Sequence, residues 1–255
     1  MSKKLIQLQQ WTPARVALGH VGNAIPTCAI LKFQQDCAEA RDAVHTVWNW
    51  QATQQQLQAH GETVVVVNSC TLSRTEYLKR PDLGRILSNE SSEYLQSIRK
   101  AYDVVFIISD GLSAAAVEAH ALPLLDKISS KLSSATLSLA PIVLAPYARV
   151  ALSDEVGFYL NARIAVMFIG ERPGLSASDS MGVYLTYAPK PGNTDSARNC
   201  ISNIRPPEGL SYELATEKLL YLVKESLHRK LSGIGLKEET MVAIASNKNQ
   251  IKRIS

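Results

Sequence analysis

The 255-residue sequence lacks the features of a membrane, exported or disulfide-linked protein. No apolar run is long enough to span a bilayer. The N-terminus, MSKKLIQLQQWTP, has neither the apolar centre nor the small-residue cleavage site of a signal peptide. The cysteines lie far apart and form no CxxC pair, which argues against a zinc or redox motif; they are Cys28, Cys37, Cys70 and Cys200. We therefore expect a cytoplasmic protein with free thiols and no membrane partner.

Strong charge of one sign is also missing. The formal net charge is only +4, and the single basic cluster is Lys248, Lys252 and Arg253 in the last residues. A nucleic-acid-binding protein usually concentrates its basic side chains on one face or helix. The scatter of charge therefore argues against a nucleic-acid partner, while a hydrophobic content of 46% is ample for a packed core.

The common catalytic and nucleotide-binding motifs are absent as well. No GxGxxG follows a predicted strand, and neither a P-loop nor a GxSxG elbow is present. The five histidines show no metal-ligand or triad spacing, and His120 fits a packing residue on a helix better than a base. Spacing alone thus leaves the chemistry open.

The first third of the chain has the pattern of helices. After Pro26, apolar residues recur at steps of three and four, which predicts a long amphipathic helix; they are Ile30, Phe33, Cys37, Ala40, Val44 and Val47. A glutamine-rich stretch (51–58) continues as a solvated helical face and ends at His60 and Gly61, a helix-stop signal. A β-branched run (63–67) predicts a strand, and residues 80–99 predict a further helix. We expect residues 1–98 to form a mostly helical N-terminal domain.

From residue 99 onward, apolar strands alternate with helices. Predicted strands at 103–109, 142–145, 164–169 and 182–187 are separated by helices at about 113–132 and 154–160, and a last helix covers about 211–231. Pro123 should kink the first of these helices or begin a new one. Continuous apolar strands between helices indicate a parallel sheet covered on both faces. The predicted fold class is α/β, with a Rossmann-like, three-layer, parallel-sheet domain at 99–235 and a polar C-terminal tail at 236–255.

Four polar segments follow the predicted strands, where ligands bind in open parallel sheets. Their ranges are 109–113 (SDGLS), 146–150 (PYARV), 170–174 (GERPG) and 200–204 (CISNI). Each segment alone could be a simple turn, with Asp110 and Ser113 as helix caps. Four such loops on one rim favour a binding site.

Several short motifs, in this order and spacing, resemble the ethanolamine ammonia-lyase small-subunit family over residues 12–235. They are TPARV (12–16), ARDAV (40–44), YLKRPDLGR (77–85), SDGLS (109–113), GERPGL (170–175) and CISNI (200–204). The resemblance implies an adenosylcobalamin-dependent lyase that converts ethanolamine to acetaldehyde and ammonia. It implies an obligate large subunit that binds ethanolamine, while the small subunit covers the lower corrin face and nucleotide tail and holds no catalytic residue. The cofactor's own base would stay on cobalt, in agreement with the missing DxHxxG motif.

By the same resemblance, the cofactor contacts fall on Val150, Glu171 and Cys200. The alternatives are plain packing for Cys200 and an ion pair with Arg149 or Arg172 for Glu171. The charged residues of the RPDLGR motif, Arg80, Asp82 and Arg85, would join the two domains or meet the large subunit.

Some features leave other interpretations open. His20 and Cys37 stand where the family usually has arginine and histidine, which affects the expected partner interface. The short N-terminal segment favours a free cytosolic enzyme over one packaged in a bacterial microcompartment. The main alternative function is a corrinoid- or nucleotide-binding protein without lyase activity, and a stand-alone NAD-dependent dehydrogenase is a second one.

Overall fold

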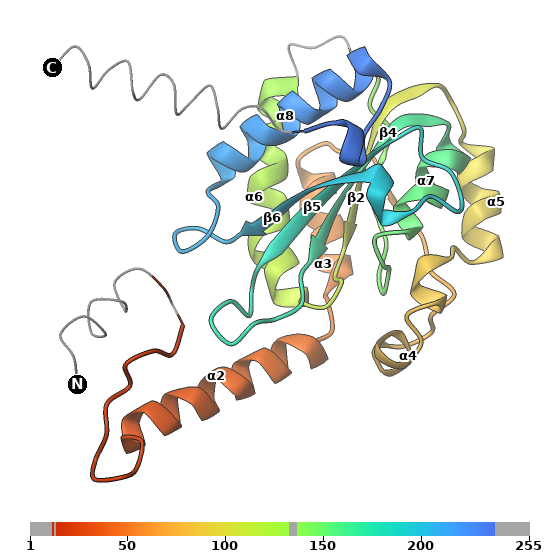
Figure 1. Cartoon of the computed structure of the whole chain (residues 1–255). Helices are drawn as coiled ribbons and strands as arrows, with labels where there is room; N and C mark the ends of the chain where they lie inside the picture. Colours follow the sequence, from red (N-terminus) through yellow and green to blue (C-terminus); the bar gives the residue numbers. More distant parts are fainter. Residues whose placement is uncertain (1–11, 13, 133–136, 238–255) are drawn as a thin grey trace, which may run out of the picture.

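A computed structural model describes residues 12, 14–132 and 137–237 of the chain. Its centre is a six-stranded sheet in the order β1-β3-β2-β4-β5-β6 (Figure 1). The strands are β1 (Val64–Val66), β2 (Tyr102–Ser109), β3 (Ile142–Leu144), β4 (Ala162–Gly170), β5 (Met181–Tyr187) and β6 (Arg198–Ile204). The predicted α/β class is confirmed, and so are the predicted strands around residues 65, 106, 143, 167 and 185.

The sheet is mixed rather than wholly parallel. β1, β3, β2 and β4 pair in parallel, whereas β5 is antiparallel to β4 and β6 is antiparallel to β5. Parallel neighbours need a crossover connection of a dozen or more residues, usually a helix. The connections at 171–180 and 188–197 are shorter and contain no α-helix, so the chain turns back on itself at both. The prediction that 200–204 follows a strand is also wrong, because these residues form the end of β6.

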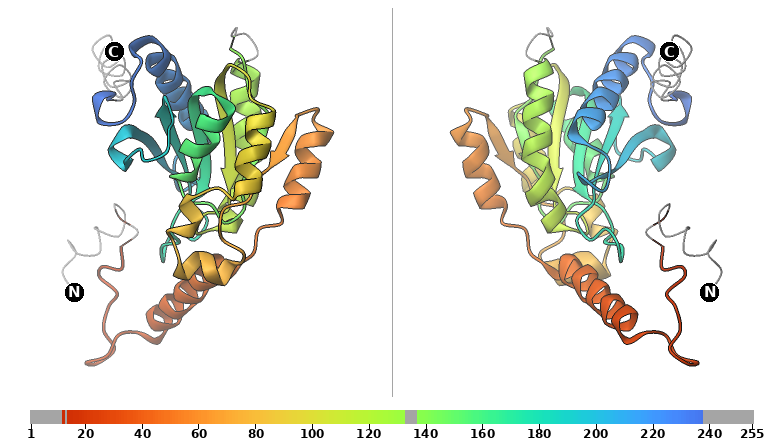
Figure 2. Two further views of the ribbon diagram at one scale, coloured as in Figure 1. Left: turned by 90° about the vertical axis from the view of Figure 1, so that its right-hand side faces the viewer. Right: turned by 90° about the vertical axis from the view of Figure 1, so that its left-hand side faces the viewer.

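Helices cover both faces of the sheet, which confirms the three layers (Figures 1 and 2). One face packs against α3 (Trp50–Ala59), α6 (Ala114–Leu132) and α8 (Tyr212–Arg229), and the other against α5 (Asn89–Ser97) and α7 (Leu152–Leu160). Alternate residues of a strand point to opposite faces. Val104, Phe106 and Ile108 of β2 accordingly join the first core, and Val105 and Ile107 join the second.

α6 bears out its predicted inner face. The five positions predicted to point inward are all buried; they are Val117, Leu124, Leu125, Ile128 and Leu132. The helix includes Pro123 within its span, so no new helix begins there.

The single helix predicted over 80–99 is wrong. The segment instead holds a short 3-10 turn (Leu83–Arg85) and α5, while α4 (Arg74–Lys79) ends just before it. Pro81 cannot continue a helix, and Ser88 starts a new one because its side chain accepts a hydrogen bond from the Ser91 N–H. The 3-10 turn contacts the loop after β3, because the Arg149 N–H donates to the Gly84 carbonyl at 2.7 Å.

The predicted N-terminal helix is confirmed as α2 (Thr27–His45), but its environment differs from the expectation. α2 extends away from the layered body (Figures 1 and 2), and only Asp36 and Ala43 are buried along it. Ile30, Leu31 and Phe33 are exposed. β1 precedes residue 98 yet pairs with β3, so the sheet includes a strand from the first third of the chain; the division at residue 98 stays a prediction. Most of the predicted 236–255 tail lies outside the described residues.

Candidate ligand-binding site at the carboxyl end of the sheet

The loops that follow β2, β3 and β4 meet at one edge of the sheet. The loop after β2 approaches the end of β4 so closely that neither side tolerates a Cβ atom. A Cβ added to Gly111, whose φ is +53°, would lie 2.3 Å from the Gly170 carbonyl oxygen, and one on Gly170 would lie 2.1 Å from that of Ser113. The glycines of the SDGLS and GERPGL motifs thus allow this contact, and the Leu112 N–H donates to the Gly170 carbonyl across it at 3.0 Å.

A buried ion pair between Arg74 and Asp110 holds these loops together. Arg74 of α4 donates through Nη1 to the Asp110 carboxylate at 2.8 Å and to the Gly111 carbonyl at 2.7 Å. The other Asp110 oxygen accepts from the Tyr147 N–H at 2.7 Å, which ties in the loop after β3. Burial raises the pKa of Asp110 to about 6, and the neighbouring Arg74 guanidinium opposes that rise. Asp110 therefore organises the loops rather than facing the ligand.

Tyr77 connects Arg74 to the loop after β3. Two guanidinium groups lie near its ring, that of Arg74 at 5.1 Å and that of Arg149 at 4.1 Å from the ring centre. Its hydroxyl donates to the Ala148 carbonyl at 3.2 Å, and Arg149 donates to the Tyr77 carbonyl at 3.1 Å. Arg149 Nε is buried without a hydrogen-bond partner in the described structure. A buried donor of this kind favours a ligand group with an oxygen acceptor.

Two adjoining cavities open above this framework. One, of about 420 Å³, is lined by Tyr77, Gly111, Leu112, Arg149, Val150, Ile169, Gly170, Glu171, Arg172 and Tyr184. The other, of about 490 Å³, is lined by Pro81, Asp82, Arg85, Arg149, Val150, Ala151, Tyr184 and Asp195. They share Arg149, Val150 and Tyr184, so together they form one groove along the edge of the sheet. Grooves of this size, with mixed apolar and polar lining, are typical ligand sites.

The structure brings two of the three predicted site residues into this groove. Val150 lies where the two cavities meet, and Glu171 lies at the end of β4. The Glu171 carboxylate accepts hydrogen bonds from the hydroxyls of Ser180 and Ser202, each at 2.5 Å, and from the Asn203 N–H at 3.2 Å. Neither Arg149 nor Arg172 is among these donors. The described hydrogen-bond partners of Glu171 are therefore neutral groups.

Cys200 lies beside the groove rather than in its lining. It is exposed on β6 and pairs in register with Tyr184 of β5. Burial raises the pKa of the Tyr184 hydroxyl, so it stays protonated and can donate. Cys200 and Ser202 alternate with the buried Ile201 and face the side of the sheet that α7 covers at β4. The exposed Cys200 side chain therefore lies on this face, next to the groove.

Sequence reasoning missed three residues that build the site. Arg74 had no signal, because a lone arginine on a short helix does not reveal a partner 36 positions away. Tyr184 and Ser180 lie on or beside a strand that was predicted, but only the antiparallel pairing brings them to the groove. Of the RPDLGR residues, Asp82 and Arg85 line the groove, whereas Arg80 pairs with Asp82 at 2.7 Å on the surface.

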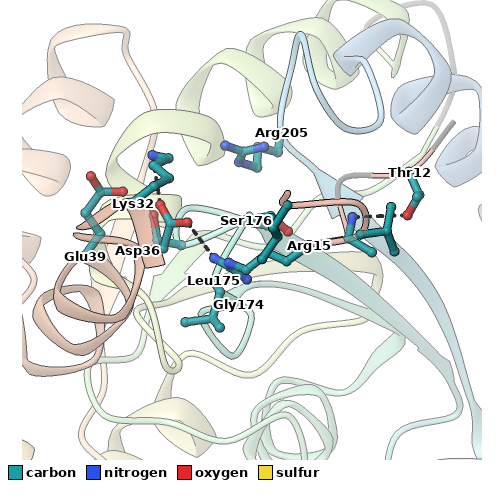
Figure 3. Close-up of a pocket in the computed structure, with 14 residues that line it drawn as sticks. Thr12, Arg15, Lys32, Asp36, Glu39, Gly174, Leu175, Ser176 and Arg205 are labelled. Carbon is teal, nitrogen blue, oxygen red and sulfur yellow. Dashed lines mark hydrogen bonds and ion pairs between the residues drawn. The ribbon is translucent and has the colours of Figure 1, made fainter. Parts of the chain in front are cut away.

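A separate cavity of about 480 Å³ lies between the N-terminal segment, α2 and the loop at 174–178 (Figure 3). Its charged side chains largely satisfy one another, since Asp36 pairs with Arg15 at 2.5 Å and with Lys32 at 2.9 Å. Arg205, on its wall, pairs with Asp179. The cavity therefore lies where the N-terminal segment and α2 meet the rest of the protein.

Two general features bear on the kind of site. Within the described residues, His, Cys, Asp and Glu side chains form no group of three that could hold a metal ion. None of the described helices combines the length and apolar character needed to cross a membrane.

The comparison with known proteins identifies the family. The model of the family described as ethanolamine ammonia-lyase light chain (EutC) matches residues 2–237. The ethanolamine ammonia-lyase small subunit of Azotobacter vinelandii (strain DJ) is 50% identical over 241 residues, which cover 93% of this chain and 89% of that protein. The protein of the same name from Pseudomonas fluorescens (strain Pf0-1) is 47% identical over 241 residues, with 93% and 88% covered. This chain therefore belongs to the ethanolamine ammonia-lyase light-chain family.

Proposed function

We propose that this chain is the small subunit of an adenosylcobalamin-dependent ethanolamine ammonia-lyase, which converts ethanolamine to acetaldehyde and ammonia. In this proposal the groove above Val150 and Glu171 covers the lower corrin face and the nucleotide tail, while a large subunit binds ethanolamine. The observation that carries the proposal is the assembly of Val150, Glu171 and the neighbouring Cys200 around one open groove in a chain of this family.

The lining suits a large ligand with an apolar ring and a rim of amides. Val150 offers an apolar surface, Glu171 offers carboxylate oxygens to amide N–H groups, and Arg149 has an unpaired buried Nε for an oxygen acceptor. The exposed strip of β6 next to the groove extends this surface. When bound, adenosylcobalamin supplies the radical chemistry, and the chain's own residues would position it and exclude water from its lower face.

The exposure of α2 supports an obligate partner. Leu31 is 59% exposed and Phe33 is 44% exposed on a helix that stands away from the body. Exposed apolar side chains on a projecting helix are a common feature of subunit interfaces. We propose that the large subunit covers this helix and the upper side of the groove.

The test is to co-express this chain with the large subunit and to assay acetaldehyde formation from ethanolamine, with and without adenosylcobalamin and with each subunit alone. Activity only with both chains and the cofactor is the expected result. Glu171→Ala or Val150→Glu should then raise the cofactor concentration needed for half-maximal activity. A stable complex that binds cobalamin yet releases no acetaldehyde would favour a corrinoid-binding role without lyase activity.

A further inference from the structure

Glu171 is held by an unusually complete set of donors for a side chain at the edge of a sheet. Both carboxylate oxygens are engaged: Oε1 accepts from the Ser202 hydroxyl at 2.5 Å, and Oε2 accepts from the Ser180 hydroxyl at 2.5 Å and the Asn203 N–H at 3.2 Å. Hydrogen bonds to an ionised carboxylate are among the strongest in proteins. The orientation of the side chain is therefore set by three groups.

The donors come from segments on two sides of Glu171. Ser180 ends the connection that leads into β5, while Ser202 and Asn203 lie on β6. Gly182 of β5 forms the floor: a Cβ there would lie 2.9 Å from Glu171 Oε1 and 3.3 Å from its Cγ. The missing side chain of Gly182 thus leaves the space that the Glu171 side chain occupies.

We propose that Ser180 and Ser202 are positioning residues that fix the Glu171 carboxylate for the bound cofactor; this rests on the proposed contact between Glu171 and the cofactor. An ionised carboxylate offers about four acceptor sites, and three of them are taken here. The remaining site is then presented in one orientation to an amide N–H of the ligand. Without the serines only the Asn203 N–H would hold the side chain, and binding would have to immobilise it.

The experiment measures the adenosylcobalamin concentration for half-maximal activity, and kcat at saturation, in the complex with the large subunit. The variants are Ser180→Ala, Ser202→Ala, Ser202→Thr and Gly182→Ala. Ser202→Ala is also combined with Glu171→Ala, which leaves no carboxylate to position. Ser176→Ala is the matched control, because Ser176 is exposed on the same connection between β4 and β5. Size-exclusion chromatography checks that each complex assembles.

Each serine-to-alanine change should raise the half-saturating concentration about three- to tenfold with kcat unchanged, from the cost of immobilising one side chain. Ser202→Thr keeps the hydroxyl and should restore binding, and Gly182→Ala should weaken binding because it displaces the carboxylate. Ser176→Ala should match the wild type. In the Glu171→Ala background, Ser202→Ala should add nothing.

Three results would overturn the proposal in distinguishable ways. If Ser202→Ala still weakens binding in the Glu171→Ala background, Ser202 acts on the ligand directly. If Glu171→Ala weakens binding while both serine variants behave as wild type, the positioning role fails and the Glu171 contact stands. If Glu171→Ala itself has no effect, the proposed Glu171 contact fails and the positioning role with it.

Discussion

Replacing Arg74 with methionine tests whether the buried pair with Asp110 holds the edge of the sheet together. We expect the free energy of unfolding to fall by about 3–5 kcal/mol at pH 7.5, the usual cost of removing one partner from a buried ion pair. The side chains of Arg74 and Asp110 are 7% and 0% exposed, so water cannot replace the lost partner. Methionine keeps much of the volume of the arginine stem and avoids a large cavity.

The magnitude follows from what Arg74 contacts. Besides Asp110, it donates to the carbonyls of Val44 at 2.8 Å and Gly111 at 2.7 Å. Each acceptor left without a donor costs about 1–3 kcal/mol when buried. The stranded Asp110 carboxylate adds to this cost only while it is ionised. Because these contributions share one side chain, they are not simply additive.

The sign of the pH dependence follows from Asp110. Burial raises its pKa from 3.8 to about 6, so its contribution to stability is present below its ordinary pKa and is lost as the pH rises through about 6. Arg74 lowers that pKa, and its removal therefore moves the loss to higher pH. The difference between wild type and Arg74→Met should grow between pH 6 and 8. At pH 5, where Asp110 is protonated in both, only the lost hydrogen bonds remain, at about 1–3 kcal/mol.

Urea unfolding followed by tryptophan fluorescence suits this measurement, because Trp48 is 3% exposed. Arg74→Lys is the matched control: it keeps the charge, so the pH dependence should stay like that of the wild type even though stability falls. Adding Asp110→Asn to Arg74→Met removes the stranded charge, keeps an acceptor for the Tyr147 N–H, and should recover about 2 kcal/mol at pH 7.5. A difference that does not change with pH, or no recovery in the double variant, would refute the reasoning.

Three further changes test other parts of the structure. Gly170→Ala should cost about 2 kcal/mol or more in unfolding free energy, because its Cβ would lie 2.1 Å from the Ser113 carbonyl oxygen; a wild-type urea midpoint would contradict the close contact. Tyr184→Phe removes the hydroxyl of a residue that lines both cavities of the groove and should raise the adenosylcobalamin concentration for half-maximal activity about two- to tenfold, the range for one hydrogen bond; an unchanged value would place the hydroxyl outside the binding surface. Leu31→Ser should weaken co-purification with the large subunit without changing the chain's own stability, because Leu31 is 59% exposed; full recovery of the complex would show that this part of α2 is not covered.

Much of the fold could be predicted because local signals were strong. The apolar run of β2 and the inner face of α6 have patterns that only a buried strand and an amphipathic helix explain. The segment at 80–99 was less accessible, because Pro81 and Gly84 lie inside the range where a single helix was predicted and the helix begins only at Asn89. The antiparallel direction of β5 could not be predicted from the sequence either, because strand direction depends on the length and path of the connections rather than on the strand residues themselves.

The site was predicted only where motif and strand end coincide. Val150 and Glu171 directly follow buried strands or the loops after them, and the structure places both in the groove. Arg74 and Ser180 could not be found this way, because each acts through a partner that the fold, not the sequence, brings near.

The direction of β6 explains why the CISNI motif (200–204) belongs to the same site. Two successive reversals make β6 run the same way as β4, so Ile204 ends at the edge where Gly170 ends, through Met181 between them. Ser202 and Asn203 then lie within hydrogen-bonding distance of Glu171, although the CISNI residues belong to a strand and not to a loop. Cys200 lies two residues further back and therefore faces the open strip rather than the groove. Tyr184 lines the groove and pairs in register with Cys200. A ligand that contacts both Glu171 and Cys200 must consequently extend from the groove across Tyr184.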